Sequence, residues 1–317
     1  MNVAAAYTFA WRNATKIPEP VLRGLFTVVA DVTWLRHGKS VRRMEQNYAR
    51  VRPDLGAAAI RRLSRAGMRS YMRYFREAFT LQGVDPERLR ARVRVEGYDE
   101  HVRAVVDGGG AVALALGHLG NWDLAGAYGS RYLASVLTVA ERLKPDELFQ
   151  EFVRFRSSIG IDVLPLGNGD TLGALIRGAK EGSKLIPLLS DRDLTSTGIE
   201  VDLAGHRARV AAGPALLGLE AGIPVHAVGV TYERLRGARR RAARTPWGIV
   251  IRFHPPLPVP DADLPRDERA RLLTQGWVDQ LTRTIVEHTH DWHMLQRVFV
   301  ADLGPARRRT APEAEPG

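Results

Sequence analysis

The stretch AVALALGHLGNWD, residues 111–123, decides the fold that we expect for this sequence. Its first six residues, Ala111 to Leu116, are all apolar, and a continuous apolar run of this length is typical of a fully buried strand. Glycine and polar residues follow directly, so that His118 lies at the strand end and Asp123 in the first turns of the next helix. The stretch therefore predicts a strand-to-helix turn inside an α/β fold.

Similar apolar runs recur after this one, and helical stretches such as 145–157 and 171–180 lie between several of them. Buried strands that alternate with helices are typical of a largely parallel sheet. We therefore expect an α/β fold with a mostly parallel central sheet flanked by helices. The other expected strands are Val136 to Ala140, Ile161 to Leu166, Leu185 to Ser190, Ile223 to Val230 and Gly248 to Phe253.

The residues before this sheet are expected to be helical. Between Ala57 and Leu81, apolar and basic residues alternate at helical spacing, which predicts one long amphipathic helix. A late helix is expected over 265–289, where Pro265 suits the first turn. We expect N-terminal helices in 1–50, one large domain in 51–304 and a disordered tail in 305–317, which has little apolar content. The arginines expected on the solvated face of the long helix are Arg61, Arg62, Arg65, Arg69, Arg73 and Arg76.

The 317 residues include 46 basic and 35 acidic side chains, a formal net charge of +11, and no cysteine. The lack of cysteine excludes disulfides, thiolate-bound zinc and a cysteine nucleophile. The positive charge favours an anionic partner, which is nucleic acid, an anionic membrane surface or a phosphorylated substrate. Because the charge is spread along the chain and only 7% of the residues are aromatic, the composition argues against nucleic acid.

Residues 21–35, VLRGLFTVVADVTWL, are the best candidate for contact with a membrane. Arg23 and Asp31 interrupt the stretch, so we do not expect it to span a bilayer. An apolar face beside a basic collar is typical of a helix in the membrane interface, and a helix packed on the domain fits the pattern equally well. We expect no signal peptide and a location on the cytoplasmic face of the membrane. The collar consists of Arg36, His37, Lys39, Arg42 and Arg43.

The residues after the first strand form a candidate acid–base site. A carboxylate such as Asp123 can hold the imidazole of His118 in one tautomer, which makes the imidazole a useful general base. Gly117 and Gly120 would let a substrate approach the backbone, and N–H groups near Gly120 and Asn121 are candidates to stabilise an oxyanion. From spacing alone, a capped helix beside a buried histidine fits the pattern as well.

The sequence GHLGNWDLAG, residues 117–126, resembles the His, four residues, Asp signature of bacterial glycerolipid and lipid A acyltransferases. Together with the arginine-rich helix before it and the sequence SDRD at 190–193, it looks like the branch that holds the late lauroyl/myristoyl acyltransferases of lipid A and the phosphatidylinositol mannoside acyltransferases. The resemblance covers about residues 42–299. Lipid A enzymes commonly begin with a membrane-spanning helix, so this sequence is more similar to the mannoside enzymes.

The resemblance implies an O-acyltransferase, with residues 51–304 as its acyltransferase domain. The expected reaction moves a long acyl chain, such as palmitoyl, from acyl-CoA to a mannose hydroxyl of phosphatidylinositol mannoside, with His118 as general base. Acyl-CoA is then a co-substrate, no metal or other cofactor is expected, and the enzyme is expected to act as a monomer. The alternatives are an acyltransferase for another glycolipid such as lipid A that uses acyl carrier protein, and a basic protein that binds nucleic acid or anionic lipid without catalysis.

A second strand end carries Ser190, Asp191, Arg192 and Asp193. If the two strands are neighbours, Asp191 projects toward His118 and is an alternative to Asp123 as the carboxylate that orients it. Pairing of Asp191 or Asp193 with an arginine remains an equal possibility. Arg192 is a candidate to bind the substrate, and Thr197, in the polar loop that follows, is a candidate contact for the headgroup of the donor.

Further candidates for substrate binding lie on other elements. Glu141 follows the second expected strand, and Arg156 can either hold a phosphate or brace Asp123, because a guanidinium suits both anions. Glu220 stands alone on an apolar helix, where it needs either an arginine partner or a role in a pocket. The arginines at 236–244 are expected in a loop between strands, in contact with phosphates or lipid headgroups. The histidines at 288–293 are expected to belong to a packed C-terminal segment and not to a metal site.

Overall fold

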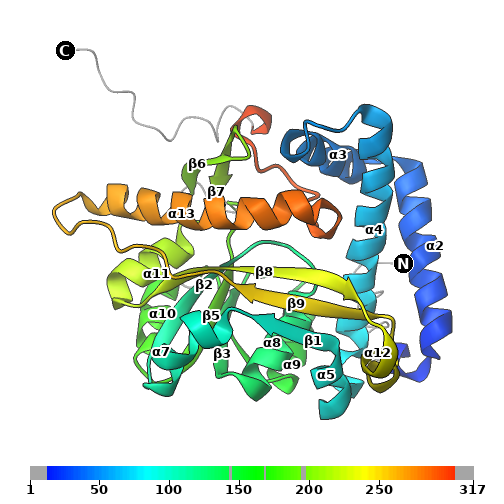
Figure 1. Ribbon diagram of the computed structural model, residues 1–317, viewed down its shortest axis with the longest axis horizontal. Helices are drawn as coiled ribbons and strands as arrows, with labels where there is room; N and C mark the ends of the chain where they lie inside the picture. Colours follow the sequence, from blue (N-terminus) through cyan, green and yellow to red (C-terminus); the bar gives the residue numbers. More distant parts are fainter. Residues whose placement is uncertain (1–12, 143–144, 168, 194–197, 304–317) are drawn as a thin grey trace.

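The structure is a computed structural model that describes residues 13–142, 145–167, 169–193 and 198–303 (Figure 1). A seven-stranded sheet with the order β1-β9-β8-β2-β5-β3-β4 lies at its centre. All neighbouring strands in it are parallel except the antiparallel pair β8 and β9, so the mostly parallel sheet predicted from the apolar runs is confirmed. The strands are β1 (Val93–Glu96), β2 (Ala111–Leu116), β3 (Ser135–Ala140), β4 (Ile161–Pro165), β5 (Lys184–Leu189), β8 (Val225–Arg234) and β9 (Trp247–Phe253).

Helices cover both faces of this sheet. Alternate residues of β2 point to opposite sides: Val112, Leu114 and Leu116 belong to one apolar core, whereas the alanines between them belong to another. The first core is closed by α5 (Pro86–Arg92), α7 (Arg103–Asp107), α8 (Trp122–Tyr132) and α9 (Asp146–Ser158), with α6 (Tyr98–His101) at its edge. The second is closed by α10 (Thr171–Ala179), α11 (Gly213–Ala221) and α13 (Arg266–Glu287), and Figure 1 shows α13 running across the sheet on this side.

Three long helices precede the sheet: α2 (Glu19–Arg36), α3 (Lys39–Val51) and α4 (Ala57–Thr80). The helix predicted for residues 57–81 is therefore confirmed. Met44 and Tyr48 of α3 are fully buried in the same core as α13, and α2 packs along α4 (Figure 1). No helix among the described residues is both long enough and apolar enough to cross a membrane.

The prediction of a solvated arginine face on α4 is wrong for Arg76 and holds only in part for Arg61 and Arg73, which are half-buried. Arg76 is buried and forms ion pairs with Glu19 and Glu77. The guanidinium of Arg73 stacks on the rings of Trp247 and Tyr232, 3.6 and 4.5 Å from their centroids. Both side chains lie where α4 crosses the core, and acidic or aromatic partners compensate for the burial of their charge.

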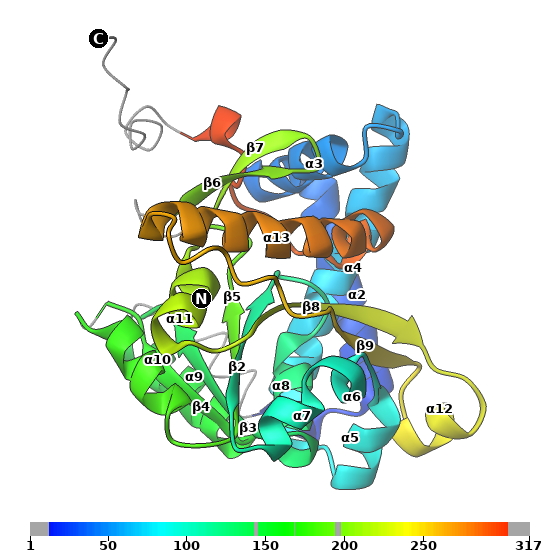
Figure 2. The ribbon, with the colours of Figure 1, turned by 60° about the vertical axis from the view of Figure 1, so that its left-hand side comes forward.

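Several elements lie outside the pattern of apolar runs. The strands β6 (Ile199–Leu203) and β7 (His206–Val210) form a separate antiparallel hairpin beside α13 (Figure 2). The short helix α12 (Gly237–Ala243) connects β8 to β9, where the arginine cluster at 236–244 was expected to form a loop. Residues 305–317, the expected disordered tail, lie outside the described residues.

Candidate active site

The sheet register places His118 beside Asp191. Strands β2 and β5 are parallel neighbours at the centre of the sheet, and Leu116 pairs with Leu189 at their carboxyl ends. Each side chain stands two residues beyond its strand, so both lie above the same edge of the sheet. The Nδ1 atom of His118 lies 2.5 Å from Oδ1 of Asp191. The carboxylate that contacts the histidine therefore comes from the second strand end and not from the motif itself.

Asp191 is fully buried and stays charged because it receives three hydrogen bonds. Besides the imidazole, the backbone N–H of His118 donates to Oδ2 at 2.9 Å and the indole N–H of Trp292 donates to the same oxygen at 2.8 Å. Burial alone would raise the pKa of this carboxyl, but the charge of His118 and these donors outweigh burial and hold the pKa below its usual value. An anionic Asp191 fixes the proton of His118 on Nδ1, which leaves Nε2 as the basic nitrogen.

His118 opens onto a cavity of about 320 Å³. The side chain of His118 is 17% exposed, whereas that of Asp191 is not exposed at all. Three of the predicted substrate-binding residues, Glu141, Arg156 and Arg192, line this cavity with His118. The aromatic wall of the cavity and the segment 293–296 were not predicted from the sequence as parts of the site. The aromatic wall consists of Tyr71, Tyr74, Phe75, Trp122 and Phe152.

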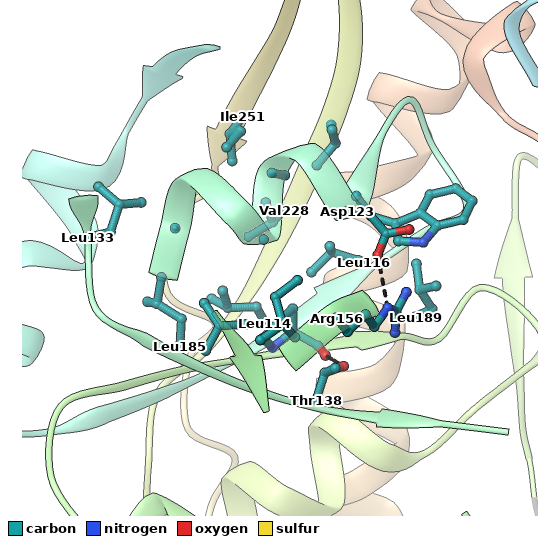
Figure 3. Close-up of a pocket in the computed structure, with 18 of the residues that line it drawn as sticks. Leu114, Leu116, Asp123, Leu133, Thr138, Arg156, Leu185, Leu189, Val228 and Ile251 are labelled. Atoms are coloured by element: carbon teal, nitrogen blue, oxygen red, sulfur yellow. Dashed lines mark hydrogen bonds and ion pairs between the residues drawn. The ribbon is translucent and has the colours of Figure 1, made fainter. Parts of the chain in front are cut away.

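An apolar slot continues from this cavity between α8 and the sheet (Figure 3). The two spaces share Trp122, Val139, Arg156 and Leu189, so they meet at the carboxyl end of the sheet. Figure 3 shows Asp123 and Arg156 at one end of the slot and Leu133 and Leu185 at the other. The slot is narrow, with a volume of about 70 Å³, and its lining is mostly aliphatic.

Asp123 does not contact His118. Its carboxylate is buried and accepts hydrogen bonds from Nε of Arg156 at 2.9 Å and from the hydroxyl of Tyr74 at 2.8 Å. Burial and the nearby carboxylate raise the pKa of Tyr74 well above its usual value, so the phenol remains a donor. Asp123 therefore fixes Arg156 at the junction of cavity and slot, and the sequence alternative in which Arg156 braces Asp123 matches this geometry.

Removal of this carboxylate should destabilise the fold. We expect Asp123→Ala to lower the free energy of unfolding by about 3–5 kcal/mol, because it leaves the buried guanidinium of Arg156 without its counter-charge. Denaturant unfolding followed by circular dichroism measures the change. Asp99→Ala is the matched control, since Asp99 forms an exposed ion pair with Arg103, and it should hardly change stability. Equal stability of the two variants would contradict a structural role for Asp123.

The glycines and Asn121 of the motif pack against, or hydrogen-bond with, other residues of the protein. A Cβ on Gly120 would lie 2.5 Å from the carbonyl oxygen of Val230, and the Gly120 N–H donates to the carbonyl of Asp291 at 3.0 Å. A Cβ on Gly117 would press on Asp191 at 3.1 Å. Asn121 is fully buried, caps α8 through the N–H of Leu124 and donates to Glu77. The Gly120 N–H is therefore already paired within the protein, and the expectation that it stabilises an oxyanion is corrected. The approach of a substrate to these glycines stays a prediction.

Other predicted residues lie elsewhere. Glu220 is exposed and pairs with Arg266 at 2.6 Å, so its partner is an arginine at the surface and it lines no part of the cavity. Asp193 lies 3.8 Å from Nε of Arg209, both side chains being nearly buried. Thr197 lies outside the described residues. Within the described ranges, no group of three or more His, Asp or Glu side chains lies close enough to hold a metal ion.

The chain is similar in sequence to known acyltransferases. Residues 2–300 match the family described as "Bacterial lipid A biosynthesis acyltransferase". The chain is 34% identical over 303 residues to a "Phosphatidylinositol mannoside acyltransferase" of Mycolicibacterium smegmatis, covering 95% of this chain and 93% of the relative. It is equally identical over 305 residues to a protein of the same name from Mycobacterium tuberculosis, covering 96% and 90%.

Among solved structures, the chain is similar to the 1-acyl-sn-glycerophosphate acyltransferase PlsC of Thermotoga maritima. The sequence identity is 15% and the TM-score 0.35, with 70% of this chain and 86% of the other covered.

Proposed function

Because the chain belongs to the bacterial lipid A biosynthesis acyltransferase family, it is an acyltransferase, and we propose that it transfers a long acyl chain from acyl-CoA to a mannose hydroxyl of phosphatidylinositol mannoside. The observation that carries the proposal is the His118–Asp191 pair beside a cavity that continues into an apolar slot. The cavity suits a sugar headgroup and the slot suits an acyl chain. The names of the two mycobacterial relatives support the mannoside as acceptor.

The mechanism needs no covalent enzyme intermediate. Nε2 of His118 takes the proton of the mannose hydroxyl while the hydroxyl oxygen attacks the thioester carbonyl. The tetrahedral intermediate then collapses, the carbon–sulfur bond breaks, and the imidazolium returns the proton to the departing thiolate. Asp191 remains anionic throughout and stabilises the imidazolium. An ester and free coenzyme A are the products.

The charged groups that line the cavity divide the binding task. Arg156 and Arg192 provide positive charge for the phosphates of the substrates or for the oxyanion, in place of the Gly120 N–H. Arg192 is oriented by a hydrogen bond to Gln296. Glu141 follows β3, the parallel neighbour of β5, and accepts hydrogen bonds from sugar hydroxyls.

The slot determines the length of the acyl chain in this proposal. One face of α8 lines the slot. Its residues there are, in chain order, Trp122, Ala125, Gly126 and Gly129, and Leu133 follows the end of the helix. Since the slot as it stands has a volume of only about 70 Å³, the proposed entry of an acyl chain requires that its leucine, valine and isoleucine side chains move aside. Each methylene of the acyl chain that is buried contributes about 0.8 kcal/mol to binding, or about a fourfold preference, so a chain that fills the slot binds most tightly.

Gly129→Leu should therefore shift the donor preference toward shorter chains. A Cβ at Gly129 meets Val136 and Leu185 only at ordinary contact distances, so the helix tolerates it, while the rest of the leucine side chain fills the far half of the slot. Competition between palmitoyl-CoA and shorter acyl-CoAs measures the shift, with Arg131→Leu on the exposed side of the same helix as control. An unchanged preference in Gly129→Leu would contradict the assignment of the slot.

Contact with the membrane is proposed for the outer face of α2. Leu22 and Ala30 of this helix are buried, whereas an apolar stripe on the opposite side is exposed to solvent. Phe26 of α2 and Phe75 of α4 pack in one small cluster, and Phe75 also lines the active-site cavity. The helix that carries the α2 stripe thus packs against the wall of the cavity that a membrane lipid would enter. It consists of Val21, Leu25, Val28, Val29, Val32 and Leu35.

Basic residues flank the α2 stripe at both ends. Arg23 lines a surface hollow with Arg234, Arg236 and Arg240, near α12. At the other end lies the predicted collar, in which Arg43 pairs with Asp302 and His37 with Glu45. A weak apolar insertion combined with cationic attraction gives reversible binding, because each cation near an anionic surface contributes about 1 kcal/mol.

Sedimentation with liposomes tests this orientation. We expect binding to anionic liposomes that falls as salt rises, and weaker binding of Val28→Asp, because a charge on the α2 stripe opposes insertion. Val259→Asp is the matched control, since Val259 is an exposed valine away from this stripe. Equal binding to neutral liposomes, or equal loss in both variants, would contradict it.

The proposed reaction is tested by incubating the purified protein with palmitoyl-CoA and a mannosylated phosphatidylinositol. We expect a lipid whose mass has increased by one palmitoyl group and whose fragments carry this group on mannose, with release of free coenzyme A. Hydrolysis of the thioester without an acylated mannoside, or transfer only from acyl carrier protein, would contradict the proposal.

A further inference from the structure

A residue far from the motif contacts the proposed catalytic pair. Trp292 is completely buried, and its indole N–H donates to Oδ2 of Asp191 at 2.8 Å. This oxygen is the one that also receives the backbone N–H of His118. Trp292 is not among the residues that line the active-site cavity, so it acts on the site only through its neighbours.

The backbone around Trp292 is attached to the loop that carries His118. Leu119 and Trp292 form an antiparallel bridge, the N–H of His293 donates to the carbonyl of His118 at 2.7 Å, and the N–H of Gly120 donates to the carbonyl of Asp291. On the other side, the hydroxyl of Tyr48 donates to the carbonyl of Trp292 at 2.9 Å. The position of the indole relative to Asp191 is therefore fixed by the loop that carries His118 and by α3.

We propose that Trp292 is a positioning residue for the acyl transfer: its indole N–H fixes the rotation of the Asp191 carboxylate, so that Oδ1 is held toward Nδ1 of His118. The inference rests on the proposed function, because it assumes that His118 is the general base. A buried carboxylate with too few donors is costly and is free to rotate toward other donors. The donor from Trp292 removes this freedom and leaves Oδ1 for the imidazole.

Packing alone does not account for the contact. Trp277 on α13 is a tryptophan of nearly identical burial, 1% exposed against 0% for Trp292, and belongs to the same apolar core. Its indole N–H has no acceptor among the described residues. A tryptophan can thus be accommodated in this core for its ring alone, and Trp277 is the natural control for the loss of an indole N–H.

The test replaces Trp292 by phenylalanine and by benzothienylalanine, in which sulfur stands in place of the N–H and the shape of the ring is kept. We expect kcat to fall about tenfold or more in both, the size of a lost hydrogen bond to a charged group. KM for both substrates should stay unchanged. The acid limb of kcat/KM should move to higher pH, because a carboxylate with one donor fewer holds the protonated imidazole more tightly. Trp277→Phe should change none of these quantities.

The other charged and titratable groups near the pair are all retained in these variants; they are Tyr71, Arg73, Tyr74, Glu141, Arg156, Arg192, His290, Asp291 and His293. Wild-type kcat and an unshifted acid limb in the benzothienylalanine protein would overturn the inference. So would an equal change in Trp277→Phe.

A readout without turnover separates this inference from the proposed function. The Nδ1 proton of His118 lies in a short hydrogen bond and should give a low-field proton resonance, which moves in both Trp292 variants and not in Trp277→Phe. A resonance that stays in place would overturn the positioning role even if the enzyme is active. A wild-type protein that shows the resonance but acylates no mannoside would instead contradict the proposed function.

Discussion

His118→Ala is expected to lower the rate of acyl transfer by a factor on the order of 10²–10⁴, the usual contribution of a general base. The affinity for acyl-CoA should be retained, because the apolar slot and the arginines of the cavity remain. Steady-state kinetics and equilibrium binding of acyl-CoA measure the two quantities separately. A loss confined to kcat would show that the imidazole acts in the transition state.

His206→Ala is the matched control for this variant. His206 is exposed on the β6–β7 hairpin and does not line the active-site cavity, so its loss should leave the rate unchanged. A fully active His118→Ala would contradict the assignment of the base, and so would a variant that has lost affinity for acyl-CoA in proportion to its rate.

Asp191→Asn is expected to reduce transfer by a factor of about 10² or more. The amide of asparagine can donate a hydrogen bond to Nδ1, which places the proton of His118 on Nε2, the nitrogen that must accept the proton of the substrate. Loss of the carboxylate also removes the negative charge that stabilises the imidazolium. The same steady-state assay measures the effect, and size and shape are almost unchanged by the substitution.

Asp123→Asn is the matched control for Asp191→Asn, since both carboxylates are buried and accept hydrogen bonds from other side chains. An asparagine at 123 can still accept the hydrogen bond of Arg156 through its amide oxygen, while its amide N–H donates to the hydroxyl of Tyr74 instead of accepting from it. The folded fraction should therefore retain most of its activity while its stability is lower. The reverse outcome, an active Asp191→Asn and a folded but inactive Asp123→Asn, would return the orienting role to Asp123.

The central sheet could be predicted because parallel strands are buried on both faces and are therefore apolar throughout, as in 111–116 and 185–190. This signal does not apply to β1, whose sequence VRVE is half polar, or to the β6–β7 hairpin, which alternates charged and apolar residues on its own small sheet. The position of Arg73 likewise depends on stacking with the rings of Tyr232 and Trp247, which no sequence pattern within α4 indicates.

The candidate site was predictable where its residues stand at strand ends. His118 follows one apolar run and Asp191 another, but only the order of the strands decides that these two are neighbours and that Asp123 turns to Arg156. Trp292 and His293 reach the site from a short segment near the end of the chain, through hydrogen bonds with residues at 118–120. Such contacts depend on tertiary structure, so spacing along the sequence carries no trace of them.

Direct transfer from the thioester to the hydroxyl over His118 is tested most directly by intact-protein mass spectrometry. The enzyme is mixed with palmitoyl-CoA, quenched in the first turnover, and weighed with and without the mannosylated acceptor. We predict protein of unchanged mass under both conditions, and an acylated mannoside only when the acceptor is present and His118 is intact. Protein heavier by one palmitoyl group that loses this mass on addition of the acceptor would contradict the mechanism.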